Sequence, residues 1–599
     1  MIVLGLNCGH GAAAALVVDG KVLAAIEEEK LNRVKGYVGF PFAAMDHVLA
    51  VGNVARGDVD RVALGMENVA EFSYCFIHLV RQVFQRGGYW TAKARVLDLY
   101  KYLCHRWDSS ALLEAHFYRL FERATGIARD KVVKVNHHLA HAASAFYTCP
   151  WPEALIITAD GKGDGLCGGA YVGSREGVRP LDAVSDRYSV GQLYQAVTKF
   201  LGYRVNRHEG KIMGLAAYGR AEETAEILRE LIGVEDDGRM YNRCDDREWL
   251  ARDPVAFYER EVEPRDYISA RYVRYLNGGL RRHAIVHQLY QNFLREKGGE
   301  YGPEDWAAGV QRLTETVLLS YVQRFAHLCP EGRLCLAGGV FANVRVNQLV
   351  GESASVSRIY VQPAMDDAGC ALGAALQVAA DAGEIGQQPA WETVYQGPGY
   401  TEEDMAVSLA AADCPFRKSD AFAEDVALRL HRGKIVGRFS GRLEWGPRAL
   451  GNRSILARPT EKDINQTLNH RLQRTEFMPF APAILAERAG DYLRGYDQDD
   501  LAARCMTVTY DIEPDKAEAI PAVVHVDGTA RPQVVFEGEQ PDFHRIISAY
   551  GQLSGIPVVV NTSFNMHEEP IVATPGDAIR AFKEGAVDCL SMGPFIVDA

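Results

Sequence analysis

Hydrophobic and polar positions alternate in blocks along the first part of the chain. Residues 2–33, IVLGLNCGHGAAAALVVDGKVLAAIEEEKLNR, contain three apolar runs, separated first by a glycine-rich loop and then by Asp19-Gly20. An Asp-Gly pair between apolar runs is a strong signal for a tight hairpin turn. The pattern therefore predicts a strand, a glycine-rich loop, a second strand, a turn and a third strand.

The pattern changes to helical periodicity further along the chain. Residues 68–130 carry apolar positions at helical spacing, with aromatic and basic residues between them, which predicts a helical insertion. An α/β pattern returns from residue 131, and residues 220–330 are again mostly helical in pattern. RLCLAGGVFAN (333–343) predicts a strand, a glycine turn and a helix, and residues 366–386 predict a small-residue helix that ends in glycines.

The length of the chain bears on the number of domains. A single core does not accommodate 599 residues, so we expect two or three domains. Pro and Gly cluster without apolar periodicity near residues 387–400, which predicts a boundary there. A second α/β pattern occupies roughly residues 395–599, and we see no fixed-period repeat. The predicted fold class is α/β with two domains.

Composition and charge narrow the classes of function. The net charge of −13 argues against a general nucleic-acid binder, although a local basic pocket remains compatible with it. Twelve cysteines without a CxxC pair indicate free thiols in a reducing cytosol, so we expect a cytoplasmic protein. We expect no membrane span, because no run of 18 apolar residues exists. The first residues, MIVLGLNCGHG, lack the basic region of a signal peptide, so we expect a core strand there.

A metal site is the first chemical hypothesis, and it rests on the stretch NHHLAHAASAF. On a helix, His137 and His141 lie four residues apart and share a face, so two imidazoles can hold one ion. A zinc protease needs a glutamate between them, but Leu139 and Ala140 stand there. Taken alone, the pair also fits two polar residues on a half-buried face.

Two aspartates strengthen the metal hypothesis. Asp160 ends the apolar run EALIITAD, and Asp367 precedes a predicted helix after another strand. Two imidazoles and two carboxylates suit iron(II), manganese or zinc, and the two carboxylates disfavour a structural zinc site. We therefore expect one divalent ion, with iron(II) as the first choice, bound by His137, His141, Asp160 and Asp367.

Glycine-rich loops are the second chemical signal. TADGKGDG (158–165) and AGGVFAN (337–343) both follow apolar strands, and glycines let backbone N–H groups approach a phosphate closely. Either loop alone also fits an ordinary tight turn. Together with the N-terminal hairpin they resemble the actin-like ATPase fold, in which two such loops hold phosphates. No GxxxxGK[ST] motif exists, which excludes a P-loop.

The order of the motifs is similar to that of a known family. NHHLAHAASAF, DGKGDG, EGKIMGLAAYG, LAGGVFAN and MDDAG resemble the TsaD-like domain of NodU/CmcH-type O-carbamoyltransferases. GRLEWGPRALGNRSILA, RTEFMPFAPAIL, HVDGTARPQ and VVVNTSFN resemble the YrdC-like domain of that family. The resemblance covers nearly the whole chain. It implies a TsaD-like, actin-like ATPase domain over residues 1–390 and a YrdC-like α/β domain over residues 395–599.

The resemblance also implies nucleotide contacts in the N-terminal domain. Lys35 matches a nucleotide-contacting lysine of the family, although a solvated lysine explains it equally well. The predicted nucleotide-binding set is Lys35, Gly161, Asp164, Gly165, Glu209, Lys211, Gly338, Gly339 and Asn343.

Arginines crowd the motifs of the second domain and suit an anionic ligand, because guanidinium forks match pairs of phosphate oxygens. Surface ion pairs are the alternative for these arginines, and strand-end capping is the alternative for the polar residues that follow IPVVV. Where many family members have arginine before PFAP, this chain has Met478, and Arg474 or Arg471 would compensate. The predicted carbamoyl phosphate set is Arg448, Arg453, Arg474, Arg531, Asn561 and Ser563, with Arg442 nearby in sequence.

His10 lies in the glycine-flanked loop of the first hairpin. The resemblance places a histidine there beside the acceptor hydroxyl, and its ordinary pKa near neutrality suits a general base. A lone loop histidine is alternatively structural. We predict His10 as the catalytic base.

The family implies a two-site enzyme that depends on ATP and metal. Carbamoyl phosphate would be cleaved to carbamate, which attacks ATP to give carbamoyl-adenylate; the adenylate would then meet the metal and an acceptor hydroxyl. A closed passage would protect these labile intermediates. The expected partner is a small-molecule hydroxyl acceptor, as in antibiotic biosynthesis, with neither nucleic acid nor membrane; a homodimer is compatible, and the oligomeric state stays open.

Two rival functions remain at this stage. One is a tRNA-modifying enzyme of the threonylcarbamoyl type, since both domains have relatives in that pathway; the acidic net charge and the GPRALGNRS type of second domain argue against it. The other is a non-catalytic nucleotide-binding regulator, which the intact metal set argues against. Aminoglycosides, macrolides, cephems and lipo-oligosaccharides all fall within the acceptor range of the family.

Overall fold

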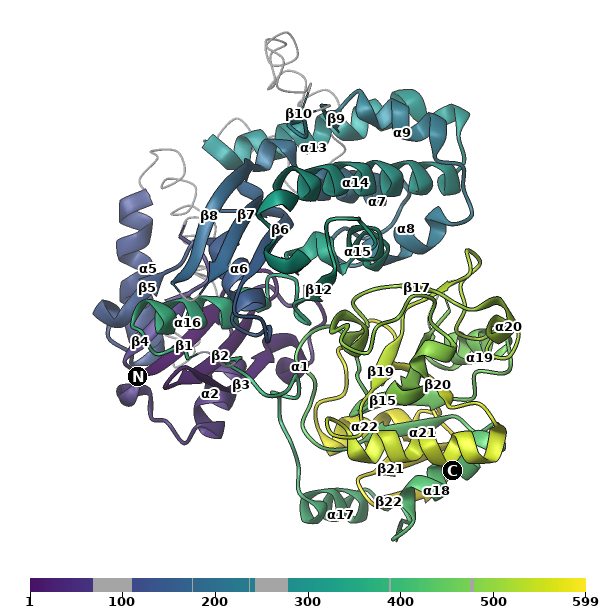
Figure 1. Cartoon of the computed structure of the whole chain (residues 1–599). Coiled ribbons are helices and arrows are strands. Elements are labelled where there is room, and N and C mark those ends of the chain that lie inside the picture. Colours follow the sequence, from purple (N-terminus) through teal and green to yellow (C-terminus); the bar gives the residue numbers. More distant parts are fainter. Residues whose placement is uncertain are drawn as a thin grey trace, which may run out of the picture.

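The structure is a computed structural model, and it describes residues 1–67, 110–174, 176–235, 237–242, 278–386, 389–473 and 479–598. In Figure 1 the two five-stranded sheets with their helices form the N-terminal half, and an eight-stranded sheet forms the C-terminal half, coloured green to yellow. Within the described residues, no helix combines the length and apolarity needed to cross a bilayer.

The first sheet has the strand order β3-β2-β1-β4-β5. Its first three strands are antiparallel, and β4 and β5 continue parallel to β1. The predicted strand, loop, strand, turn and strand are therefore confirmed. Asp19 and Gly20 both have positive φ (48° and 74°), as a type I′ hairpin turn requires. The strands are β1 (Ile2–Asn7), β2 (Ala13–Val18), β3 (Lys21–Glu27), β4 (Arg61–Leu64) and β5 (Val132–Lys134).

The second sheet repeats this arrangement. Its order is β8-β7-β6-β11-β12, again with three antiparallel strands followed by two parallel ones. Two sheets of one topology in sequence confirm the actin-like fold. One expectation is wrong in detail: Asp160 does not end its strand, because β6 continues to Gly163 with a register irregularity after Ala159. The strands are β6 (Ala154–Gly163), β7 (Leu166–Ser174), β8 (Gly177–Ser185), β11 (Arg333–Ala337) and β12 (Arg358–Val361).

Two helices fill the space between these sheets. Helix α6 (His137–Phe146) packs on the second sheet, α16 (Gly369–Asp381) packs on the first, and the two helices pack on each other. Small residues allow this close approach: a Cβ at Gly5 would lie 1.9 Å from Ala371 O, and one at Gly373 would lie 1.8 Å from Ala140 O. The N-terminal ends of both helices therefore meet at one place.

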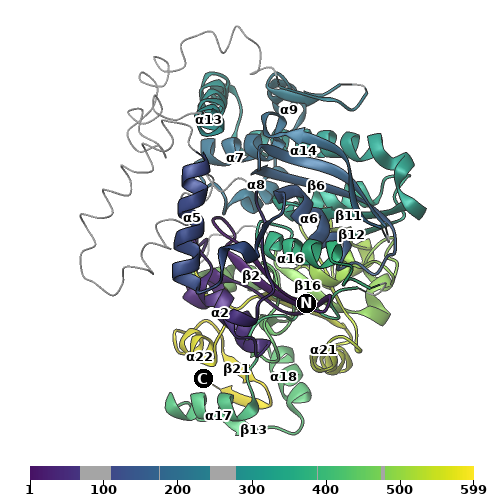
Figure 2. The same cartoon turned by 90° about the vertical axis from the view of Figure 1, so that its left-hand side faces the viewer.

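Helices outside the sheets confirm most of the helical predictions. Residues 68–109 of the predicted insertion lie outside the described residues, and its remaining part contains α5 (Figure 2). Phe121 of this helix packs against Phe40. A short hairpin of β9 (Ile232–Val234) and β10 (Met240–Asn242) interrupts the predicted helical region. The helices are α1 (Glu28–Asn32), α2 (Phe42–Val51), α5 (Ser110–Thr125), α7 (Val190–Phe200), α8 (Glu209–Ala216), α9 (Glu222–Arg229), α13 (Gly278–Lys297), α14 (Pro303–Phe325) and α15 (Val344–Gly351).

The C-terminal half contains a mixed sheet of order β13-β22-β21-β14-β15-β20-β16-β19. Helices α18 and α21 pack together over it and bury Leu430, Phe543 and Ile547 against the apolar strands. The strands are β13 (Arg417–Lys418), β14 (Val436–Phe439), β15 (Arg453–Ala457), β16 (Ala481–Leu485), β19 (Gln533–Val535), β20 (Val558–Ser563), β21 (Cys589–Met592) and β22 (Phe595–Asp598); β17 (Tyr510–Asp511) pairs with β18 (Thr529–Ala530), and the helices are α17 (Glu402–Ala411), α18 (Phe422–His431), α19 (Ile464–Arg471), α20 (Pro514–Ala517), α21 (Pro541–Ser554) and α22 (Pro575–Lys583).

A buried lysine joins the two halves. Lys30 Nζ donates to Glu444 O (2.9 Å) and Gly446 O (2.7 Å), and it pairs with Glu27 Oε2 at 2.9 Å. Gly446 N in turn donates to Glu27 Oε1 at 2.9 Å. A buried charge is tolerated only when it is paired and hydrogen-bonded, and Lys30 meets that condition through both halves. The loop that begins the GPRALGNRS motif is thereby held against the N-terminal half.

Candidate active sites

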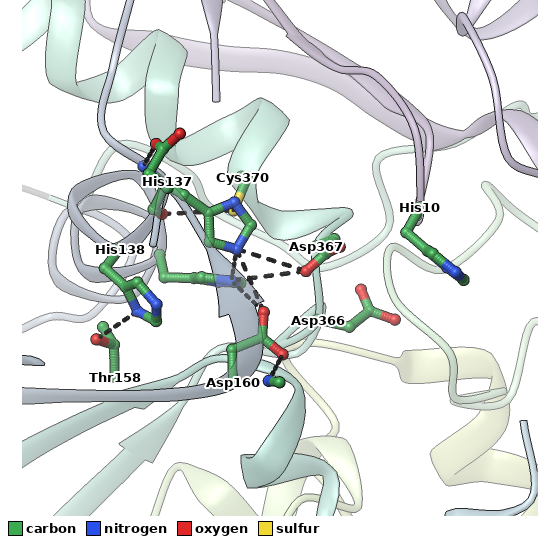
Figure 3. Close-up of polar contacts among 12 residues, drawn as sticks. His10, His137, His138, Thr158, Asp160, Asp366, Asp367 and Cys370 are labelled. Carbon is green, nitrogen blue, oxygen red and sulfur yellow. Dashed lines mark hydrogen bonds and ion pairs between the residues drawn. The ribbon is translucent and has the colours of Figure 1, made fainter. Parts of the chain in front are cut away.

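Four side chains from α6, β6 and the loop before α16 converge on one point (Figure 3). His137 Nε2 lies 3.2 Å from Asp160 Oδ2 and 3.6 Å from Asp367 Oδ1, and His141 Nε2 lies 3.4 Å and 3.9 Å from the same oxygens. The two Nε2 atoms are 3.1 Å apart. One atom from each residue thus lies within 4.8 Å of all the others, which is the set that the sequence predicts.

Local structure holds this cluster in place. Asn136 caps α6 by accepting hydrogen bonds from the backbone N–H groups of His138 and Leu139, and Asp164 Oδ2 accepts from His137 N at 2.8 Å. Gly163 lies against the imidazole, because a Cβ there would approach His137 Cδ2 to 2.0 Å. The β6–β7 hairpin therefore requires glycine at this position to bring Asp160 beside His137.

The electrostatics of the cluster fit a divalent cation. Burial, together with the neighbouring Asp160, raises the pKa of Asp367 well above its usual range. Burial also opposes ionisation of Asp160, but hydrogen bonds from His137 and His141 hold its pKa well below the ordinary value. Two close carboxylates facing two imidazole nitrogens form a donor set of two N and two O, which suits iron(II), manganese or zinc.

Cys370 and His138 lie beside the cluster rather than in its centre. Cys370 Sγ is 3.8 Å from His137 Nδ1, on the ring nitrogen opposite the carboxylates, where outer partners of metal ligands usually lie. His138 Nδ1 lies 3.0 Å from Thr158 Oγ1, and burial lowers the pKa of His138 to about 3. The third histidine of NHHLAHAASAF is therefore a buried structural residue.

The predicted phosphate loops meet around Asp160. Gly161 N donates to Asp160 Oδ1 at 2.6 Å, and a Cβ at Gly339 would lie 2.9 Å from the same oxygen. Gly338 has φ +106° and leaves no room for a Cβ, which would lie 2.2 Å from Ala159 O. Gly165 forms the tip of the β6–β7 turn with φ +79°. The two loops are thus adjacent, as the predicted phosphate site requires.

Two of the predicted nucleotide contacts have structural partners. Both oxygens of Asp164 accept from Glu67 N, and one also accepts from His137 N, so this carboxylate caps α6. The predicted helix does not open at Gly338 and Gly339: a four-residue 3-10 turn comes first, and α15 begins at Val344. Asn343 caps α15 and exchanges amide hydrogen bonds with Gln311 at 2.7 and 3.2 Å.

The remaining predicted nucleotide residues lie at the entry to α8 and after α1. Glu209 begins α8, where its Oε1 accepts from Asn206 N at 2.6 Å, and burial raises its pKa. Lys211, two residues further along α8, is buried. Lys35 Nζ pairs with Glu29 Oε1 at 2.7 Å, and Lys35 O accepts from Arg207.

His10 lies apart from the metal cluster on the side of Asp366 in Figure 3. Asn7 Nδ2 donates to the backbone oxygens of His10 and Gly11 at 2.7 and 3.1 Å, which fixes the tight loop. The residue is exposed, and its Nε2 lies 3.2 Å from Asn206 Nδ2. Desolvation lowers the pKa of His10, opposed by Asp160 and Asp366, which favours the neutral imidazole.

Arg448 and Arg531 form an arginine pair without an acidic partner of its own. Each Nε is buried and has no hydrogen-bond partner within the described part of the chain. Burial lowers the pKa of Arg448 to about 10, with Asp366 opposing that change, and burial and Arg448 both lower the pKa of Arg531. Two desolvated, mutually repelling guanidinium groups are the arrangement expected of an anion site.

The other predicted carbamoyl phosphate residues differ in their surroundings. Arg453 stacks on Phe439 at 3.8 Å, and its guanidinium donates to the backbone oxygens of Ser440 and Pro398, which is a structural arrangement. Asn561 Nδ2 donates to Gln533 Oε1 at 2.7 Å, while Asn561 Oδ1 is buried without a partner among the described residues. Ser563 ends β20.

Arg471 is one of the two arginines expected to compensate for Met478. Its Nη1 donates to Asp588 Oδ1 at 2.8 Å. Arg474 and Met478 lie outside the described residues.

Sequence reasoning missed two polar residues, the half-buried Asp366 and the buried Arg438. Asp366 lies between His10 and the metal cluster in Figure 3, and its double-aspartate motif signalled it. Arg438 lies in β14 with Nε and Nη1 buried and unpartnered in the described chain, and its signal is a charge inside the apolar run IVGRF.

A cavity of about 360 Å³ lies between the two halves. Its lining includes Gln311 and Arg345 from α14 and α15, and Phe480 and Arg531 from the C-terminal half. The partner of Asn343 and one arginine of the pair therefore line the same space.

Known families and proteins match this chain over most of its length. The family description "Carbamoyltransferase N-terminus" matches residues 2–376, and "Carbamoyltransferase C-terminus" matches residues 427–599. The nodulation protein NolNO of Sinorhizobium fredii is 30% identical over 596 residues, which are 98% of this chain and 79% of NolNO. The nodulation protein NolO of Bradyrhizobium diazoefficiens is 31% identical over 469 residues, 77% of this chain and 78% of NolO.

Similarity to solved structures is weak. Component A of the (R)-2-hydroxyglutaryl-CoA dehydratase of Acidaminococcus fermentans covers 63% of this chain and 96% of its own at 14% identity, with a TM-score of 0.30. A score this low supports no conclusion about this chain.

Proposed function

The chain belongs to the carbamoyltransferase family, and we propose that it transfers a carbamoyl group from carbamoyl phosphate to a hydroxyl of a small molecule, using ATP. Transfer of a carbamoyl group follows from the family. The route through carbamoyl-adenylate, the two separate sites and the residues below are the proposal.

The first half-reaction belongs to the arginine pair. Water cleaves carbamoyl phosphate to carbamate and phosphate; an oxygen of carbamate then attacks the α-phosphorus of ATP, and pyrophosphate leaves. Arg448 and Arg531 hold the phosphate oxygens, since forked guanidinium groups match them in pairs. The unpartnered Oδ1 of Asn561 suits the N–H₂ of the carbamoyl group.

The second half-reaction belongs to the N-terminal half. The acceptor oxygen attacks the carbonyl carbon of carbamoyl-adenylate, AMP leaves, and the hydroxyl proton passes to His10. The loops at Gly161 and Gly338 hold the phosphate beside the cluster. When bound by His137, His141, Asp160 and Asp367, a divalent ion, iron(II) in our proposal, supplies positive charge to the departing phosphate.

The adjacency of the two sites is the observation that carries this proposal. Asp366, next to the metal ligand Asp367, acts electrostatically on Arg448 of the other half. The backbones of the two halves also approach each other closely here, because a Cβ at Gly446 would lie 2.5 Å from Pro363 O. Carbamate and its adenylate hydrolyse easily, so a short distance between the two sites limits their loss to water.

A small hydroxyl acceptor is the partner that we propose. Two similar proteins are named for nodulation, and the net charge of −13 disfavours a nucleic-acid substrate. We also propose a domain boundary between residues 390 and 395 and a reducing cytosol as the setting, the latter because nine described cysteines are free thiols.

Mass spectrometry tests the proposed route directly. The purified chain is incubated with ATP and ¹³C-carbamoyl phosphate, and the products are examined for ¹³C-carbamoyl-adenylate, AMP and pyrophosphate. We expect the adenylate only when both substrates are present. Pyrophosphate release without carbamoyl phosphate, or carbamoyl transfer that proceeds without ATP, would contradict the route.

A further inference from the structure

We propose that Asn206 is a positioning residue for His10, and that Glu568 of the C-terminal half holds Asn206 in place. The proposal rests on the proposed function in one respect, because it takes His10 as the base of the transfer step. The contacts themselves do not depend on that role.

A chain of side-chain amides ends on His10. Gln195 Nε2 donates to Asn206 Oδ1 at 2.6 Å, and Asn206 Nδ2 lies 3.2 Å from His10 Nε2. The same Gln195 nitrogen lies beside Gly161 of the predicted phosphate loop, since a Cβ built on Gly161 would lie 3.4 Å from it. The two amides thus lie between the phosphate loop and the imidazole.

The amide of Asn206 can select the tautomer of His10. In the orientation described, Asn206 Nδ2 donates to Nε2, which requires the His10 proton on Nδ1. A half-turn of both amides exchanges their oxygen and nitrogen atoms without moving the heavy-atom frame. Asn206 Oδ1 then accepts from Nε2–H, Nδ1 becomes the free lone pair that takes the hydroxyl proton, and the same oxygen stabilises the imidazolium that results.

The backbone at Asn206 suits this task. Its φ of +62° is in the left-handed region, which asparagine and glycine adopt most readily. Its N–H donates to Glu209 Oε1 at 2.6 Å, at the start of α8. The side chain is therefore presented from a defined turn.

Glu568 clamps this turn from the other half of the molecule. Glu568 Oε2 accepts from Arg204 Nη1 at 2.8 Å and from Arg207 Nη1 at 2.6 Å, and His208 Nε2 lies 3.6 Å from its other oxygen. Single exposed ion pairs contribute little, but one carboxylate shared by three residues on both sides of Asn206 forms a network. Because Glu568 follows Ser563 closely in the chain, the clamp couples the base to the C-terminal site.

Three charged groups act on His10, namely Asp160, Asp366 and Arg207, whereas the Asn206 amide is neutral. Asn206→Asp keeps the shape and the turn but replaces the N–H₂ donor by an acceptor with negative charge. We expect the pKa of His10 to rise by about one unit, since an opposite charge at hydrogen-bond distance favours the charged form. The imidazole then becomes neutral at a higher pH. In a plot of transfer rate against pH, the rise on the acidic side should therefore move to higher pH.

Acylation by diethyl pyrocarbonate measures this shift without catalysis. The rate of modification of the His10 peptide is followed by mass spectrometry across pH in the full chain, with the His431 peptide as internal control. We expect a higher midpoint for His10 in Asn206→Asp and an unchanged one for His431. An unchanged His10 midpoint would overturn the positioning role, even if the chain proves to form no carbamoyl-adenylate.

Kinetics separate positioning from folding. Asn206→Gly keeps the left-handed turn and removes the amide, and we expect kcat for transfer to fall about tenfold with little change in KM and with normal adenylate formation. Glu568→Gln should lower kcat for transfer by a few-fold, whereas the control Glu584→Gln, which breaks an exposed pair with Arg580, should not. Wild-type transfer in Asn206→Gly, or equal effects of the two glutamine variants, would refute the proposal.

Discussion

The metal cluster and the arginine pair suit ligands of opposite charge. In the N-terminal half, two carboxylates and two imidazoles face one another, and this donor set suits a cation. In the C-terminal half, Arg448 acts electrostatically on Arg531, and neither Nε has a partner among the described residues, which suits an anionic ligand.

The contrast indicates that the two halves of the chain bind oppositely charged ligands at separate places. Each region stays folded although its charges are unbalanced, because neighbouring structure holds it: small residues of α6 and α16 on one side, and the Lys30 bridge on the other. Asp366 stands between the two regions and acts on both His10 and Arg448. A ligand with phosphate at one end and a carbamoyl group at the other suits such a border.

Loss of the cation site is expected to have the largest effect. His137→Ala with His141→Ala should remove about one metal per chain and slow transfer by ~10³-fold or more, since a bound ion supplies several kcal/mol to the departing charge. Adenylate formation should continue. Elemental analysis and the two half-reactions check this, and His138→Asn, which keeps the hydrogen bond to Thr158, serves as control. Unchanged metal content in the double variant would refute the ligand assignment.

Loss of the anion site should affect the opposite half-reaction. Arg448→Ala is expected to slow carbamoyl-adenylate formation by ~10²–10³-fold, the usual effect of removing one group that stabilises developing charge. Transfer from pre-made carbamoyl-adenylate should persist. Arg448→Lys keeps the charge but loses the forked guanidinium, so its rate of adenylate formation should lie between those of wild type and Arg448→Ala. Substitution of the exposed Arg488 by alanine should leave that rate at the wild-type value. Equal loss of both half-reactions in folded protein would show that the two regions do not divide the work.

Substitution of His10, which lies near Asp366 between the two regions, should slow the transfer step alone. General-base assistance contributes about 10²–10⁴-fold, so His10→Asn should transfer at least roughly 100-fold more slowly while forming adenylate normally. The intermediate should accumulate or leak as AMP, which single-turnover mass spectrometry detects. Wild-type transfer kinetics in His10→Asn would show that His10 is not the general base of the transfer step.

The smallest expected effect concerns stability. Arg531→Met removes a buried, repelled charge and should stabilise the ligand-free protein by about 1 kcal/mol, or about 2–4 °C for a unit the size of the C-terminal half. Inorganic phosphate should raise the unfolding temperature of wild type but not of the variant, since a ligand stabilises the state that binds it. Thermal unfolding with and without phosphate checks both. Destabilisation of the ligand-free variant would mean that Arg531 is a structural residue.

Local pattern predicted the elements well but not their detailed ends. The apolar runs and Asp19-Gly20 predicted the first hairpin, and His137 with His141 predicted one helix face, because strand and helix periods are short-range properties of the backbone. The bulge at Asp160 and the late start of α15 escaped prediction, since hydrogen bonds and packing across the sheet decide where an element ends.

Long-range relations were beyond the reach of the pattern. The two five-stranded sheets share one topology, yet the sequence contains no visible repeat, because topology constrains which positions are apolar far more than which residues fill them. Asp164 stays a predicted nucleotide contact, and the pattern did not reveal that its oxygens accept the N–H groups of Glu67 and His137. Arg453 stays a predicted phosphate contact, and the pattern did not reveal the stacked ring and backbone carbonyls around it.

The kinds of chemistry present were readable from local pattern: two imidazoles one helical turn apart, glycines after strands, and arginines within a glycine-rich motif. Which of these groups lie together depends on the folding of distant segments onto one another. Asp366 and Arg448 are far apart in the chain and come together where the two halves pack, and Asn206 and His10 come together within the N-terminal half. Periodicity acts over a few residues of backbone, whereas such meetings depend on burial of side chains contributed by every part of the fold.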